Sequence, residues 1–83
     1  MATGVSRTIL LVEDDDSSRT AIAQILRREN YRVVEAKDGR LALDLLRNEE
    51  IDLILTDFKM PEMDGMDLLK AARMLKPNID VIL

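Results

Sequence analysis

The chain has 83 residues, of which 47% are hydrophobic and 34% charged, and its formal net charge is −4. This length allows one domain, and the net negative charge together with only two aromatic residues argues against nucleic-acid binding by this chain. Cysteine and histidine are both absent, which excludes a disulfide framework and any metal site built on those residues and leaves oxygen ligands for hard cations such as Mg2+.

The sequence contains neither a membrane-spanning segment nor a secretory signal. The longest apolar runs have four residues, which is too short for a membrane-spanning helix. Residues 1–7 lack the apolar centre of a secretory signal. We therefore expect residues 1–7 to form a disordered N-terminal tail and residues 8–83 to form the folded part of the chain.

The first elements in chain order are a strand and a helix. Ile9–Val12 is a continuous apolar run bounded by acids, which is typical of a strand buried on both faces of a parallel sheet. Candidate helix N-caps follow: Asp16, Ser17 and Ser18. Apolar residues then recur at helical spacing: Ala21, Ile22, Ile25 and Leu26. The pattern predicts a helix whose apolar stripe packs on the sheet.

The alternation continues to the end of the chain. Residues 32–36 predict a short strand, and a second helix follows Asp38-Gly39 and ends near Asn48. Leu53–Leu55 predicts another strand buried on both faces, followed by a loop from Phe58 to Gly65. A third helix, for which Asp64 is a candidate cap, has its own apolar stripe: Leu68, Leu69, Ala72 and Leu75. Pro77 ends it, and Ile79–Leu83 begins a fourth strand.

The order of elements, βαβαβαβ, predicts an α/β fold. Such alternation gives a parallel sheet with right-handed crossovers and helices on both faces. In sheets of this kind the functional crevice lies outside the carboxyl ends of the strands, near the point where the strand order reverses.

Acidic residues stand at that edge of the predicted sheet. Glu13–Asp16 follows the first strand, and Asp57 ends the third. Adjacent strands lie about 4.8 Å apart, so Glu13, Asp14 and Asp57 could reach one ion. Clustered carboxylates repel one another, and Mg2+ compensates that repulsion and prefers carboxylate and water ligands. The pattern favours phosphoryl transfer, with Asp57 as the nucleophile.

A simpler interpretation of the acids stays open. Acids after a strand often cap the next helix and interact favourably with its dipole. That interpretation is the better one for Asp15 and Asp16, whereas for Glu13 and Asp14 alone the two interpretations are balanced. Asp57, directly after an apolar strand, is harder to explain without a functional role.

The motifs resemble the receiver domain of bacterial two-component response regulators. The resemblance is carried by residues 9–15 (ILLVEDD), residues 37–43 (KDGRLAL) and, most specifically, residues 57–65 (DFKMPEMDG), and it runs from about Thr8 to the last residue. It implies a flavodoxin-like, doubly wound parallel sheet that is truncated after the start of the fourth strand. The later Ser or Thr and Lys positions of the family's switch would then lie beyond Leu83.

The same resemblance implies residue roles. Asp57 would accept a phosphoryl group from a sensor histidine kinase, Glu13 and Asp14 would hold Mg2+, and the backbone carbonyl of Lys59 would be a further ligand. The protein would be a cytoplasmic signalling module rather than an enzyme. It would control an output domain of the same protein, with nitrogen-regulation receivers, which carry an ATPase and a DNA-binding domain, as the nearest type.

Other outcomes stay open at this stage. One alternative is a small Mg2+-dependent aspartyl-phosphate phosphohydrolase or phosphotransferase, although Lys59 stands where such enzymes carry a general acid. A second alternative is a degenerate receiver that acts only as an interaction module. The resemblance also implies a partly bare sheet face and an apolar edge at Val81–Leu83, so a homodimer or a strand-exchanged oligomer is expected if the chain exists alone.

Overall fold

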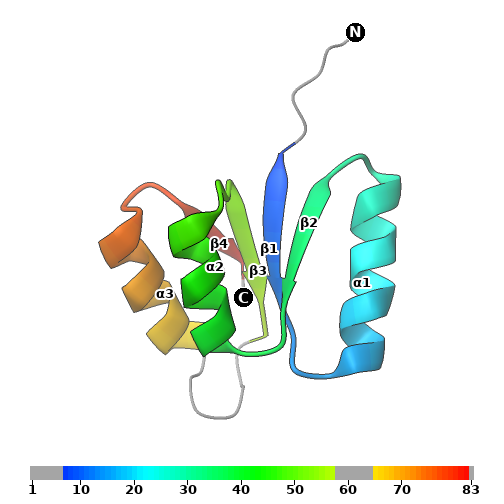
Figure 1. Ribbon diagram of the computed structural model, residues 1–83, viewed down its shortest axis with the longest axis horizontal. Coiled ribbons are helices and arrows are strands. Elements are labelled where there is room, and N and C mark those ends of the chain that lie inside the picture. The colour runs from blue at the N-terminus through cyan, green and yellow to red at the C-terminus, as the bar shows by residue number, and fades with distance from the viewer. Residues whose placement is uncertain (1–6, 58–64, 83) are drawn as a thin grey trace, which may run out of the picture.

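The computed structural model describes residues 7–57 and 65–82, which form one sheet flanked by three helices (Figure 1). The elements in chain order are β1 (Thr8–Val12), α1 (Asp16–Arg28), β2 (Arg32–Ala36), α2 (Gly39–Asn48), β3 (Leu53–Thr56), α3 (Gly65–Leu75) and β4 (Asp80–Ile82). This order confirms the predicted alternation. The tail expected at residues 1–7 lies outside the described residues except for Arg7, which is exposed.

The sheet has the strand order β2-β1-β3-β4, and all its pairs are parallel. β1 therefore lies in the middle, with Val12 beside Ala36 of β2 on one side and beside Thr56 of β3 on the other. The chain passes from β1 to β2 and then crosses back over β1 to β3, so the strand order reverses between β1 and β3. The carboxyl ends of these strands meet at the lower edge of the sheet in Figure 1.

One face of the sheet is closed by α2 and α3, which lie together on the same side in Figure 1. Large apolar side chains from the strands and both helices are fully buried there, among them Leu10, Leu46, Ile54 and Leu68. This face holds the continuous core of the described chain. We refer to it as the closed face.

The other face carries α1, which packs against β2 and β1 and leaves β3 and β4 partly uncovered. We call this the open face. β3 was predicted to be buried on both sides, and this prediction is wrong for Leu53 and Leu55, which are only half-buried because they point to the open face. Ile82 of β4 is 51% exposed on the same side.

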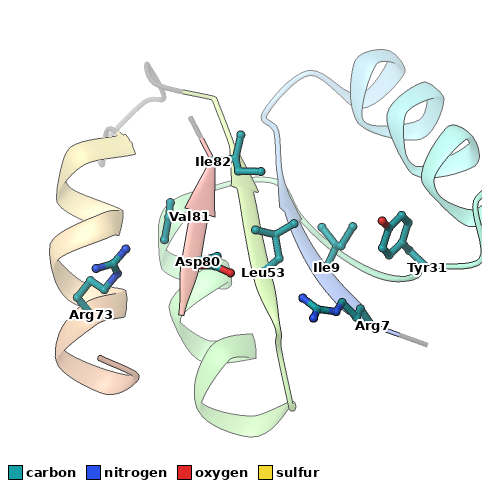
Figure 2. Close-up of a pocket in the computed structure, with 8 residues that line it drawn as sticks. All are labelled: Arg7, Ile9, Tyr31, Leu53, Arg73, Asp80, Val81 and Ile82. Carbon is teal, nitrogen blue, oxygen red and sulfur yellow. The ribbon is translucent and has the colours of Figure 1, made fainter. Parts of the chain in front are cut away.

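A cavity of about 410 Å³ lies over this uncovered part (Figure 2). Figure 2 shows Ile9 of β1 beside Leu53 of β3, with Ile82 of β4 and Tyr31 bordering them. The cavity therefore borders strand side chains on a face that a parallel sheet normally covers with helices.

The helix boundaries differ from the sequence expectation at α1. The N-cap is Asp15, whose side chain accepts a hydrogen bond from the N–H of Ser18, and Asp16 is already the first helical residue. Ile25, predicted to lie in the buried stripe, is 59% exposed, because α1 meets the sheet mainly through Ala23 and the half-buried Ile22 and Leu26. The sequence pattern correctly predicts the helix, but it does not predict how the helix is rotated about its axis.

The later elements follow the expectation more closely. α2 begins after Asp38, whose side chain caps it by accepting from the N–H of Leu41. In α3, Leu68 and Ala72 are buried as predicted, whereas Leu75 is 41% exposed. The predicted cap Asp64 and the last residue, Leu83, lie outside the described residues. None of the helices in the described ranges is long and apolar enough to cross a membrane.

Candidate functional site

The site begins where β1 ends. The N–H of Glu13 donates to the carbonyl of Ala36 at 3.0 Å, and the N–H of Asp57 donates to the carbonyl of Val12 at 3.3 Å. Each bond extends a parallel ladder by one step beyond the strands. β1 and β3 therefore deliver Glu13 and Asp57 side by side at the carboxyl edge of the sheet.

Three carboxylates come together at this edge. One carboxylate oxygen from each of Glu13, Asp14 and Asp57 lies within 4.8 Å of the others. Glu13 is half-buried, whereas Asp14 and Asp57 are exposed. Lys59, whose carbonyl was predicted as a further ligand, lies outside the described residues.

The three carboxylates of the cluster repel one another, and this repulsion shows in the pKa of Glu13. The N–H of Asp15 donates to Oε2 of Glu13 and lowers the pKa of Glu13, but burial, a hydrogen bond with Asp14 and the negative charges of Asp57 and Asp14 together raise that pKa. In the part of the chain that the structure describes, no arginine or lysine forms an ion pair with any of the three acids. A cation held by these oxygens would remove the repulsion, so the donor set fits Mg2+.

Asp15 and Asp16 do not join the cluster. Asp15 accepts from the backbone N–H of Ser18 at 2.8 Å, and this hydrogen bond lowers the pKa of Asp15. Asp16 pairs with Arg19 at 2.6 Å on the same helical turn. Helix capping therefore accounts for Asp15, and an ion pair within the helix accounts for Asp16. Glu13 and Asp14 instead belong to the carboxylate cluster with Asp57.

A cavity of about 270 Å³ lies next to the cluster and opens onto the open face of the sheet. Its walls are Leu11 and Leu55 from the strands and Ile22 from α1, and it reaches Glu13 and Asp57. An exposed carboxylate beside a cavity, such as Asp57, is accessible to an incoming group.

Among the described residues near the site, Arg19 contacts the acidic loop although the sequence analysis did not name it as a candidate. Its Nη1 donates to the backbone carbonyl of Glu13 at 2.8 Å. The available signal was its place on the first turn of the helix after the acids, which brings a long side chain back to the loop it follows.

Comparison with known sequences gives one family. Residues 9–83 match the response regulator receiver domain. The chain is 35% identical over 79 residues to the sporulation initiation phosphotransferase F of Bacillus subtilis, covering 95% of this chain and 64% of that protein. It is 43% identical over 75 residues to the transcriptional regulatory protein ZraR of Escherichia coli, covering 90% of this chain and 17% of that protein. The chain thus spans less than two thirds of the length of these relatives.

Solved structures give the same fold. The chemotaxis protein CheY4 of Vibrio cholerae superposes with a TM-score of 0.89 at 32% identity, covering 93% of this chain and 66% of that one. The response regulator TrrA of Thermotoga maritima, solved in complex with Mg(2+)-BeF, gives 0.88 at 28% identity, with 93% and 67% covered. TrrA has also been solved in complex with the histidine kinase ThkA, with a TM-score of 0.87, 28% identity and coverage of 93% and 66%.

Proposed function

The chain belongs to the response regulator receiver domain family of two-component signalling, and we propose that its Asp57 accepts a phosphoryl group from a histidine kinase. The observation that carries this proposal is the meeting of Glu13, Asp14 and Asp57, with carboxylate oxygens within 4.8 Å of one another. Of these three, Glu13 and Asp14 both follow β1, whereas Asp57 alone follows β3, and Asp57 is exposed.

We assign the metal to the same cluster. Glu13, Asp14 and Asp57 would hold Mg2+, with the backbone carbonyl of Lys59 as a further ligand. When bound there, the ion would offset negative charge on the phosphoryl oxygens. The support is the oxygen-only donor set, the repulsion that raises the pKa of Glu13, and the Mg(2+)-BeF complex of TrrA.

The chemical step uses Asp57 as the nucleophile. A carboxylate oxygen of Asp57 attacks the phosphorus, a new oxygen–phosphorus bond forms an acyl phosphate, and the bond from phosphorus to the histidine nitrogen of the kinase breaks. The electron pair of that bond stays on the nitrogen. The exposure of Asp57 and the cavity beside it leave the space that the donor histidine needs. The protein acts in this step as the acceptor of a signal and not as an enzyme with turnover of its own.

The proposed partners follow from the relatives. The complex of TrrA with a histidine kinase supports a kinase as the phosphoryl donor. The similarity to ZraR, a transcriptional regulatory protein, supports transcriptional control as the output. A cytoplasmic location and self-association of the chain stay predictions.

The first prediction tests the phosphoacceptor. Incubation of the protein with acetyl phosphate and Mg2+, followed by borohydride reduction and mass spectrometry of the peptides, should place the modification on Asp57. Asp57→Asn should remove it, because an amide does not form the acyl phosphate. Asp80→Asn is the matched control, since Asp80 is an exposed aspartate that begins a neighbouring strand, at the opposite edge of the sheet, and should leave the modification unchanged.

Modification of Asp14 in the wild-type protein would overturn the assignment. So would full modification of the Asp57→Asn variant at another acid. Omission of Mg2+ should slow the reaction, and an equal rate with and without Mg2+ would contradict the metal assignment while leaving Asp57 in place.

A further inference from the structure

The loop between β1 and α1 is held by Arg19. This loop, residues 13–15, carries two of the three acids of the site. Nη1 of Arg19 donates to the carbonyl oxygen of Glu13 at 2.8 Å. That carbonyl belongs to the peptide group that joins Glu13 to Asp14, so its orientation determines the directions in which both side chains leave the backbone.

Arg19 is itself fixed from two other directions. Its Nη2 lies 2.6 Å from Oδ1 of Asp16 in α1, and its Nε lies 3.5 Å from Oε1 of Glu35 in β2. The other oxygen of Glu35 pairs with Arg27 at 3.2 Å. Only 17% of the Arg19 side chain is exposed. A planar guanidinium with three acceptors in three directions has little freedom to rotate, so it is a rigid support for the loop.

The remaining side of the Glu13 backbone is fixed by the sheet. The N–H of Glu13 donates to the carbonyl of Ala36 in β2, and the carbonyl of Glu13 accepts from Arg19. Both interactions connect Glu13 to β2, the first directly through Ala36 and the second through Arg19 and its ion pair with Glu35, the residue before Ala36. The loop is therefore tied to a neighbouring strand by one main-chain bond and one side-chain bridge.

This arrangement opposes the repulsion within the site. Three negative groups at short range push the loop that carries Glu13 and Asp14 away from Asp57. The bond to Arg19 holds the loop in place while the site contains no cation. Groups that orient metal ligands without touching the metal commonly change metal affinity by about 10- to 100-fold when they are removed.

We propose that Arg19 is a positioning residue for the metal site, which it serves by orienting the peptide between Glu13 and Asp14. The proposal rests on the proposed function, because it assumes that these acids hold Mg2+. Arg19 touches neither the ion nor the phosphoryl group. Its contribution is the geometry of two ligands before the cation arrives.

The second prediction compares Arg19 with Arg27. Mg2+ affinity should be measured by calorimetric titration of the metal alone, and the free energy of unfolding by urea denaturation. Arg19→Gln should weaken Mg2+ binding about tenfold. Arg27→Gln is the matched control, because Arg27 shares the partner Glu35 but donates its other hydrogen bond to the carbonyl of Val33 in β2 rather than to the loop, and it should change Mg2+ affinity by less than about twofold. Arg19→Lys, which keeps a donor but loses the planar fork, should fall between wild type and Arg19→Gln.

Each outcome decides the proposal. Equal Mg2+ affinity in wild type and Arg19→Gln, or an equal loss in Arg27→Gln, would overturn it. If Arg19→Gln does not fold, Glu35→Gln replaces it. This variant keeps Arg19 but removes the negative charge that anchors it on β2, so it should weaken Mg2+ binding, by less than the roughly tenfold expected for loss of the direct support. No change in Glu35→Gln would then reject the proposal. Asp57→Asn separates the two hypotheses: if wild type and Asp57→Asn bind Mg2+ equally, the metal assignment itself has failed.

Discussion

The two faces of the sheet are made from the same strands, yet they are covered to different extents. On the closed face, α2 and α3 bury Ile54 and Leu68 completely. On the open face, α1 covers β1 and β2, and the residue before Ile54 on β3, Leu53, stays half-buried beside a cavity of about 410 Å³. The site acids lie at the edge shared by both faces, so the closed face supplies stability and the open face supplies access.

Adjacent residues on β3 give the sharpest test of this difference. Ile54 and Leu53 have similar size and occupy neighbouring positions on one strand, but their side chains enter different faces. The comparison keeps strand, chemistry and backbone context nearly constant. The two positions differ mainly in the face that the side chain enters and in the extent of its burial.

The third prediction concerns the closed face and has the largest expected effect on stability. Ile54→Ala should lower the free energy of unfolding by about 2–5 kcal/mol, because it removes buried carbons and leaves a cavity that the packed helices fill only partly. Urea denaturation followed by circular dichroism measures this loss. A loss below about 1 kcal/mol would mean that the closed face is not a tightly packed core.

The fourth prediction concerns the open face. Leu53→Ala should lower the free energy of unfolding by about 1 kcal/mol, since a half-buried side chain loses less contact and enlarges a space that is already open to solvent. The same denaturation experiment applies. A loss equal to that of Ile54→Ala would show that another segment covers Leu53 in solution and that the two faces are equally packed.

The fifth prediction has the smallest effect and concerns α1, the helix on the open face. The hydrogen bond from Ser18 N–H lowers the pKa of Asp15, so Asp15 contributes stability that is fully present above the ordinary aspartate pKa of about 3.9 and disappears as the pH falls through the lower folded-state value. Asp15→Ala should therefore be less stable than wild type at pH 7, and the difference should shrink towards pH 3.

The control for this prediction is Asp15→Asn, which keeps the capping oxygen without the charge and should lie between the two at pH 7. Denaturation curves of all three proteins at both pH values give the comparison. A difference between wild type and Asp15→Ala that stays constant with pH would exclude a charged cap.

Much of this arrangement could be predicted from the sequence. The alternation of elements predicts a parallel sheet, and a parallel sheet brings Glu13 and Asp57 to one edge because every strand ends there. The apolar run at Ile9–Val12 correctly predicts a strand buried on both faces. These predictions succeed because they depend on local periodicity and on topology alone.

The predictions that were wrong, or that the sequence did not allow, depend on how helices and strands are oriented against one another. Ile25 fits the helical stripe, yet α1 is rotated and placed so that this side chain faces solvent. Leu53 fits a doubly buried strand, but its cover depends on where α1 lies across the sheet. The bond from Arg19 to Glu13 joins residues six positions apart across a helix start, and no periodic pattern contains such a contact.

The bond from Asp57 N–H to the carbonyl of Val12 has a practical consequence for following the site. It joins the residue proposed to accept the phosphoryl group to the strand that leads into the other two acids. The chemical shift of an amide proton depends on the length of the hydrogen bond that it donates. The Asp57 amide resonance therefore reports on both halves of the site at once, which is useful in a chain that contains no tryptophan to serve as a fluorescent probe.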